Sequence, residues 1–435
     1  MTDDRFQDRF EDRPENHSEG VIALSRWRAV LARSRNPRKR LDLVMSDPQA
    51  ASVVPRIPVE EFYYLVRGVG LEDTIDVLRL ASAEQLQGCL DLDLWDRDRL
   101  STPRVLAWLE VLAELSPPVL ARTIQTLDIE LVALVLGKHA RVYDRAVGEA
   151  PDEESTYVVH RTADEAFVVE FRTSNATAAR TLERFIMRLY DGDPDLARAL
   201  LTEAKWGTTA ELEEASYRWR TARLADIGFP SYEDALVVYR EVQPSRLVAE
   251  PPPPIPEAGE APMLPVPFAE VLGGDSLLER ALAAVDDAEL LATLSASLVS
   301  VLNRVLVADR VDAADVDLVR DTTARARDTV SLALDHLGGG DVARATELLS
   351  QVGFVDLFRV GYSLTAALAR RARVLDRAGV IDPNLDALLE PRPRFSRALD
   401  PEPAGGERPF RTVADLEAME QLVATLEKSE AEGRV

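Results

Sequence analysis

One short stretch of the chain is unusually rich in arginine and aromatic side chains. It comprises Tyr217, Arg218, Trp219, Arg220 and Arg223. Guanidinium groups bind carboxylates and phosphates through paired hydrogen bonds, and Arg, Tyr and Trp often anchor protein interfaces. The stretch is therefore a candidate anion-binding or partner-binding site. A structural alternative, which the sequence favours, packs Tyr217 and Trp219 inside the protein and pairs Arg223 with Asp226 along one helix.

Two groups of aspartates suggest divalent-cation chemistry, because Mg²⁺ prefers oxygen ligands. Aspartate is also a common residue at helix starts, where the helix dipole favours negative charge. The sequence therefore favours solvated helix caps and predicts no metal site. The two groups are Asp91, Asp93, Asp96 and Asp98, and Asp309, Asp312, Asp315 and Asp317.

Motifs for covalent or acid–base catalysis are missing from the sequence. The chain has four histidines and one cysteine, Cys89, and none of them lies in a known catalytic motif. Neither G-x-S-x-G, H-E-x-x-H nor a phosphate-binding loop occurs. We expect no catalytic residue and no cofactor, although a site assembled from distant positions leaves no local motif.

Composition indicates a folded protein of a reducing compartment. The chain has 435 residues, of which 46% are hydrophobic, and its net charge is −24. A single cysteine excludes an intramolecular disulfide, and no signal-peptide pattern opens the sequence. The longest apolar runs, such as Leu131–Leu136, are far shorter than the roughly 20 residues of a membrane span. The sequence therefore predicts a soluble, cytoplasmic protein.

The charge is unevenly distributed, because residues 21–40 form a basic arm without acidic residues. Such an arm could grip phosphates and stack on a nucleic-acid base through Trp27. Alternatively, it docks on the protein's own acidic surface, and the strongly acidic remainder of the chain favours this interpretation. The basic residues nearest the folded body are Arg33, Arg35, Arg38, Lys39 and Arg40.

Residues 41–150 predict a domain of short helices joined by tight turns, after a disordered tail over residues 1–20. Helix starts are marked by pairs such as Thr102-Pro103 and by the capping box of Ser82 and Gln85. The recurrence of these helix-start signals predicts a superhelix-like array of irregular repeats.

In the next segment, residues 151–243, the residue pattern changes from one typical of helices to one typical of strands. Residues 156–160 and 166–172 are β-branched and aromatic runs on either side of a polar turn, which predicts a β-hairpin. It is the one strand pair that the sequence predicts. A helical pattern resumes at Ala176 and continues to about Tyr239.

Proline dominates residues 244–267, which contain nine of them and predict an extended linker between domains. Residues 268–435 then predict a second helical domain. Its leucines recur on one helical face, and Gly338–Gly340 ends a second long helix. The predicted fold class is mainly α and multi-helical: a superhelix-like N-terminal array, one small β-hairpin and a second helical domain.

Several segments are distinctive when they are taken together. They are Leu71–Leu78 with Ala81–Gln87, Leu90–Leu100, Tyr217–Pro230, Leu302–Asp309 and Arg408–Glu417. Over roughly residues 40–425 the chain resembles a conserved bacterial family of unknown function. The resemblance implies an all-α architecture in the cytoplasm and no activity, because none is assigned to the family. Residues 41–140 also resemble, more weakly, the cytosolic superhelical domain of magnesium transporters, which regulates and does not catalyse.

These observations predict a non-enzymatic scaffold or regulatory adaptor that presents helical surfaces to partner proteins. One alternative is a regulator that responds to Mg²⁺, as the acidic groups suggest. Another is an enzyme with a dispersed site for an anionic substrate, around Arg218, Arg220 and Glu214. Other proteins are the expected partners, nucleic acid ranks last, and the oligomeric state is not predicted.

Overall fold

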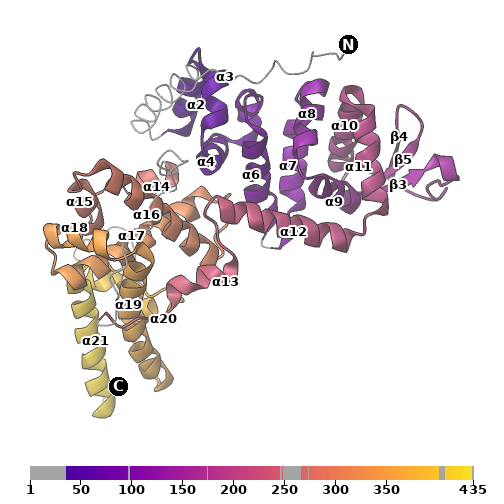
Figure 1. Ribbon diagram of the computed structural model, residues 1–435. Helices are drawn as coiled ribbons and strands as arrows, with labels where there is room; N and C mark the ends of the chain where they lie inside the picture. The colour runs from indigo at the N-terminus through magenta and orange to yellow at the C-terminus, as the bar shows by residue number, and fades with distance from the viewer. Residues whose placement is uncertain are drawn as a thin grey trace. The chain divides into compact units, whose positions relative to one another are not determined.

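The computed structural model describes residues 36–433 apart from residues 97, 174, 245–246, 248–265, 273 and 401–406. These residues are mainly α-helical, with two small antiparallel sheets (Figure 1), which confirms the predicted fold class. The chain divides into two compact units, Met1–Leu224 (unit 1) and Ala225–Val435 (unit 2).

Unit 1 consists mostly of short helices that pack on their neighbours, such as α4 on α6 and α10 on α7, α8 and α11. The α-helices are α2 (Pro37–Met45), α3 (Ala50–Val53), α4 (Val59–Val69), α5 (Ile75–Leu78), α6 (Ala83–Asp93), α7 (Thr102–Leu112), α8 (Pro117–Thr126), α9 (Ile129–His139), α10 (Ala176–Gly192), α11 (Pro194–Trp206) and α12 (Thr209–Asp226). The described residues of unit 1 also form the 3₁₀ helices η1 (Val54–Arg56), η2 (Leu71–Thr74) and η3 (Arg145–Val147).

Local sequence signals place several of these helix starts. The side chain of Ser82 accepts a hydrogen bond from the backbone N–H of Gln85, whose side chain accepts one from the N–H of Ser82, so the predicted capping box is confirmed. Asn36 caps α2 through the N–H of Lys39, and Asp193 caps α11, with proline in the first turn of both helices. Each cap gives a partner to a backbone N–H that the helix itself leaves unbonded.

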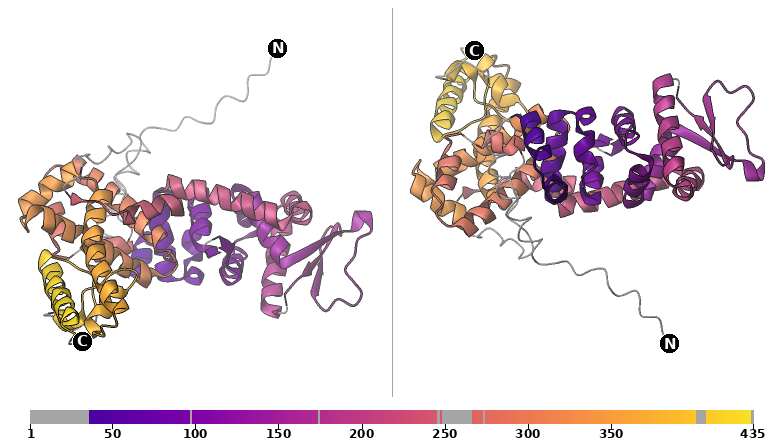
Figure 2. Two further views of the ribbon diagram at one scale, coloured as in Figure 1. Left: turned by 90° about the horizontal axis from the view of Figure 1, so that it is seen from below. Right: turned by 90° about the horizontal axis from the view of Figure 1, so that it is seen from above.

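The larger sheet has the strand order β3-β5-β4 and lies at one end of unit 1 beside α10 and α11 (Figures 1 and 2). Strands β4 (Val158–Arg161) and β5 (Phe167–Phe171) form the predicted hairpin. Strand β3 (Ala140–Asp144) adds to β5 and was not predicted, because it follows α9 directly and contains five residues only. The two-residue strands β1 (Trp95–Asp96) and β2 (Arg99–Leu100) were also missed.

Unit 2 contains longer helices with broad apolar faces. Its elements are α13 (Tyr232–Ala235), η4 (Leu236–Tyr239), α14 (Val266–Val271), α15 (Leu277–Ala283), α16 (Ala288–Ala308), α17 (Val316–Gly338), α18 (Val342–Gln351), α19 (Phe354–Arg377), α20 (Pro383–Leu389), η6 (Arg397–Leu399) and α21 (Val413–Ala431). Helices α17 and α19 pack closely, since a Cβ atom on Gly361 would lie 2.0 Å from the carbonyl oxygen of Thr329. Gly339, with a φ of 67°, ends α17 as the glycine run predicted.

The units divide at Leu224, earlier in the chain than the proline-rich segment. Elements α13 and η4 pack on α16 and therefore belong with unit 2, although the sequence grouped them with residues 151–243. Most of residues 244–267 lie outside the described residues, so the linker stays a prediction.

Among the described helices, α16 is long and apolar enough, by length and composition, to cross a membrane. Its apolar face, with Leu294, Leu298 and Leu302, is buried within unit 2. A core helix of a soluble protein meets the same criterion, so α16 is weak evidence for a membrane span. Serines and a threonine interrupt its apolar residues, so no long uninterrupted apolar run marks it in the sequence.

Candidate protein interaction surface

Helix α12 runs along unit 1 and is held there mainly by polar contacts (Figure 1). Of its eighteen residues, only Leu212, Ser216 and Leu224 are buried. Near its start, Nζ of Lys138 at the end of α9 lies 2.6 Å from Oε1 of Glu213. A helix without an apolar stripe needs such charged anchors to keep its position on the surface.

The main anchor is a group that we call the Asp91 clasp: Asp91, Gln87, Arg220, Arg223 and Asp128. The side chain of Asp91 is only 1% exposed, and Arg223 donates to it through Nε at 2.7 Å and Nη2 at 3.0 Å. Gln87 donates to the same carboxylate at 3.1 Å, while Nη1 of Arg223 lies 2.7 Å from Asp128. Burial raises the pKa of Asp91, and the neighbouring Arg223 opposes that rise.

Arg220 joins the clasp through the backbone. Its Nε donates to the carbonyl oxygen of Asp91 at 2.7 Å, and its guanidinium carbon lies 5.5 Å from the ring centroid of Trp95. The ring of Tyr217 also meets Trp95 edge-on, with the two ring centroids 6.0 Å apart. Arg220 and Arg223 therefore fix α12 to the end of α6.

Asp93, two residues after Asp91, has its own partners inside unit 1. It accepts hydrogen bonds from Nε1 of Trp108 at 2.6 Å and from the hydroxyl of Tyr63 at 3.2 Å, and Arg67 lies 3.5 Å away. Burial, and then the charge of Asp93, raise the pKa of Tyr63 well above its usual value.

The prediction of solvated caps was therefore wrong for Asp91 and Asp93. Both residues lie at the carboxyl end of α6, where the helix dipole disfavours a carboxylate. Arginines and hydrogen-bond donors supply the compensation. Asp96 and Asp98 remain exposed at the β1–β2 turn.

Asp309, at the end of α16, forms a second clasp, which we call the Asp309 clasp. Its carboxylate accepts a hydrogen bond from Tyr239 at 2.9 Å and one from Nε of Arg392 at 2.8 Å, and it pairs with Arg325. Asp309 was therefore also predicted wrongly as a solvated cap.

The other residues of that acidic group behave as predicted. Asp315 caps α17 through the N–H of Leu318, and Asp312 accepts from the N–H of Ala314. Asp317 is exposed in the first turn of α17. Within the part of the chain that the structure describes, no three His, Cys, Asp or Glu side chains come together in a way that could hold a metal ion.

Tyr217, Arg218 and Trp219 are three consecutive exposed residues of α12, and we call them the α12 surface. Tyr217 is 39% exposed and Trp219 48% exposed, and the guanidinium carbon of Arg218 lies 5.5 Å from the Trp219 ring centroid. Successive residues of a helix are about 100° apart, so Arg218 projects away from Arg220 and Arg223, whereas Tyr217 and Trp219 flank these two arginines. The structural alternative, with Tyr217 and Trp219 inside the protein, was wrong, and Arg223 pairs with Asp91 and Asp128 instead of Asp226.

Comparison with known proteins places the chain in a family. A family model described as a family of unknown function, DUF6178, matches residues 21–431. The chain belongs to this family. No curated protein and no solved structure matches it. The weaker resemblance to the cytosolic domain of magnesium transporters is therefore unsupported.

The match to the DUF6178 family model begins at residue 21 and so includes the basic arm. Arg33 and Arg35 lie outside the described residues. Arg38 lies on α2 with its Nη2 2.9 Å from Asp73, and Lys39 is exposed beside it. Arg40 is buried on the same helix, so the arm joins the folded body over its last few residues.

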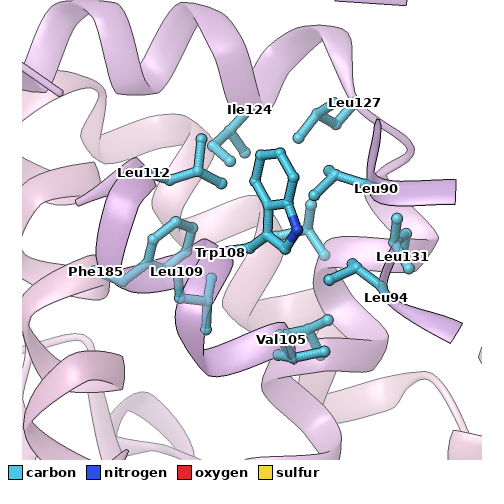
Figure 3. Close-up of a pocket in the computed structure, with 12 residues that line it drawn as sticks. Leu90, Leu94, Val105, Trp108, Leu109, Leu112, Ile124, Leu127, Leu131 and Phe185 are labelled. Atoms are coloured by element: carbon cyan, nitrogen blue, oxygen red, sulfur yellow. The ribbon is translucent and has the colours of Figure 1, made fainter. Parts of the chain in front are cut away.

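The core of unit 1 holds a small apolar cavity of about 30 Å³. Trp108 lies at its centre, among Leu112, Ile124, Leu131 and Phe185 (Figure 3). The lining offers no polar partner for a water molecule, and the volume is too small for a metabolite. This cavity is a packing feature and not a candidate site.

Proposed function

We propose that this DUF6178 protein is a non-enzymatic scaffold or regulatory adaptor, and that the α12 surface binds a partner protein. The observation that supports it is the exposure of Tyr217 and Trp219 around Arg218 on a helix that the Asp91 clasp fixes. Tyr, Trp and Arg are the side chains that dominate the binding energy of protein interfaces. A helix that is already fixed to the protein on one side loses little conformational freedom when a partner binds to its exposed side.

The clasp supports this role over the two alternatives. An anion site would need arginines with free donors, whereas Arg220 and Arg223 already bond to Asp91. A Mg²⁺ sensor would need carboxylates open to solvent, whereas Asp91 and Asp309 are bound to arginines. We place the role in the cytoplasm, because the chain's one cysteine is a buried free thiol.

Site-specific photocrosslinking tests the proposal and identifies the partner in the same experiment. A benzophenone amino acid replaces Trp219 in the full chain, expressed in its native cells. The matched control replaces Trp206, which is 69% exposed on α11. We expect discrete protein adducts from position 219 and none of the same mass from position 206.

Purified partner then gives the quantitative test. Trp219→Ala should weaken binding about 30-fold, the size of an interface hot spot, and Trp206→Ala less than about threefold. Equal adduct patterns at the two positions, or unchanged affinity of the Trp219→Ala variant, would remove the α12 surface as the binding site.

A further inference from the structure

A groove of about 350 Å³ opens on unit 1 between η2 and α7. Its floor is apolar, because Leu71 and Val111 are buried there, and its rim carries exposed carboxylates. The residues that the argument uses are Leu71, Glu72 and Asp73 from η2, and Ala107, Glu110 and Val111 from α7. An apolar floor with an acidic rim fits a segment that combines apolar and basic side chains.

Two carboxylates on the rim have no counter-charge within the described part of the chain. Neither Glu72 nor Glu110 has an ion pair or a side-chain hydrogen bond with any residue that the structure describes. The third carboxylate, Asp73, already binds Arg38, the first arginine of the described chain, at 2.9 Å. One residue of the basic arm, Arg38, therefore already forms an ion pair at this groove.

The chain enters the folded body at this groove. Asn36 is the first described residue, and Pro37 packs so closely on Gly68 that a Cβ atom there would lie 2.9 Å from Pro37 Cγ. Each residue of chain spans at most about 3.5 Å, so the residues just before Asn36 are within reach of Glu72. A tethered segment has a local concentration in the millimolar range, which favours docking on its own chain.

We propose that residues 21–35 of the same chain bind in this groove. Leu24, Trp27 and Leu31 recur at the spacing of one helical face and would cover Leu71 and Val111. The four arginines Arg26, Arg28, Arg33 and Arg35 would supply the missing charges for Glu72 and Glu110.

Disulfide trapping in the full chain tests the proposal. The native Cys89 is buried, so cysteines introduced by Leu31→Cys and Ala107→Cys report on the arm and the groove. The matched control combines Leu31→Cys with Ala222→Cys, at an alanine that is also exposed and lies on α12. We expect mild oxidation at micromolar protein to form the arm–groove disulfide within one chain at least about tenfold faster than the control disulfide.

Charge reversal provides the second measurement. Glu72→Lys with Glu110→Lys should slow the arm–groove disulfide at least tenfold, and adding Arg33→Glu with Arg35→Glu should restore it. Reversing Glu211 and Glu214 on α12 should leave the rate unchanged. Equal rates for the two cysteine pairs would overturn the proposal, as would disulfides that form only between two chains.

Discussion

The Asp91 clasp of unit 1 and the Asp309 clasp of unit 2 use the same chemistry over different distances. In unit 1, Arg220 and Arg223 lie one turn apart on α12, so the clasp fixes a single helix. In unit 2, Arg325 comes from α17 and Arg392 from the segment after α20. The Asp309 clasp therefore ties several elements of unit 2 to one carboxylate.

The aromatic neighbours of the two clasps differ in exposure. The guanidinium carbon of Arg392 lies 3.6 Å from the ring centroid of Tyr239, which also packs edge-on against Phe358 and Tyr362. Burial raises the pKa of Tyr239 to about 12. In the Asp91 clasp, Arg220 lies over Trp95, which is also buried, but Tyr217, which meets Trp95 edge-on, is 39% exposed. An arginine clasp can therefore lie within the interior, as at Asp309, or lie beside a partly exposed aromatic side chain, as at Asp91.

Removing the shared carboxylate of unit 2 should have the largest effect. Asp309→Ala leaves Arg325 and Arg392 close together without a counter-charge, so we expect a loss of about 3–5 kcal/mol in unfolding free energy. Hydrogen exchange of peptides from α17 and α19 measures the loss in unit 2. Asp317→Ala, on the exposed first turn of α17, is the control and should leave exchange unchanged. Equal exchange in both variants would mean that the Asp309 clasp does not stabilise unit 2.

In unit 1, Arg223→Met should cost about 2–3 kcal/mol. The loss is smaller because Arg223 is partly exposed and Gln87 still donates to Asp91. Tryptophan fluorescence during urea unfolding measures it, because all five tryptophans precede residue 224. Adding Asp91→Asn removes the unpaired buried charge and should recover part of the loss. A double variant as unstable as the sum of the two single variants would show that Arg223 and Asp91 do not act as a pair.

The sequence predicted interactions between residues close together in the chain, but not the pairs in the two clasps that are far apart in the chain. Ser82 and Gln85 are three residues apart, and a cap of that kind follows from the backbone geometry of one turn. The acceptor of Arg223 lies 132 residues away, so the rule for pairs within a helix led to Asp226 instead. No local pattern could show that Asp91 is buried at a helix end where a carboxylate is unfavourable.

The same difference separates the helices of the two units. In α16, Leu294, Leu298 and Leu302 trace one face, so periodicity alone predicted which side is buried. Helix α12 has no apolar stripe, and its buried side is set by its arginines. The exposure of Trp219 could not be predicted, because it depends on where the Asp91 carboxylate lies in three dimensions.

Lowering the pH should change the stability contributions of two buried carboxylates, Asp415 in unit 2 and Asp91 in unit 1, in opposite directions. Burial alone would raise the pKa of Asp415, but hydrogen bonds from Arg408 at 2.8 Å and from the N–H groups of Arg411 and Thr412 outweigh it and hold the pKa below its usual value. Its stabilisation is therefore complete above the unfolded-state pKa, about 3.9, and is lost as the pH falls through the lower folded-state value. Asp415→Asn should cost roughly 2 kcal/mol at pH 7 and progressively less towards pH 3.

Asp91 should show the opposite slope. Its folded-state pKa is raised, so the stability of the native protein relative to Asp91→Asn should grow as the pH falls through that value. Urea unfolding at several pH values, followed by tryptophan fluorescence for unit 1 and by hydrogen exchange in α21 for unit 2, measures both differences. Parallel slopes for the two variants would contradict the distinction between the two carboxylates.

Filling the apolar cavity of unit 1 should have a small stabilising effect. Val132 lines the cavity of about 30 Å³, which is close to the volume of one methylene group. Val132→Ile should raise the unfolding free energy by up to about 0.8 kcal/mol, measured by the tryptophan transition. Val330→Ile, at a fully buried position of α17 outside this lining, is the control and should destabilise unit 2 through overpacking. Destabilisation by both substitutions would show that the cores of the two units are equally tight.

Trp219→Ala should have the smallest effect on stability. Half of the ring is in water, and its cation–π contact is with Arg218, itself exposed, so we expect less than about 0.5 kcal/mol in the tryptophan transition. Tyr239→Ala in unit 2 should cost several times more, because that ring packs under Arg392 and against Phe358. A loss above about 2 kcal/mol for Trp219→Ala would mean that the ring serves the fold. Trp219 would then be no more available to a partner than Tyr239.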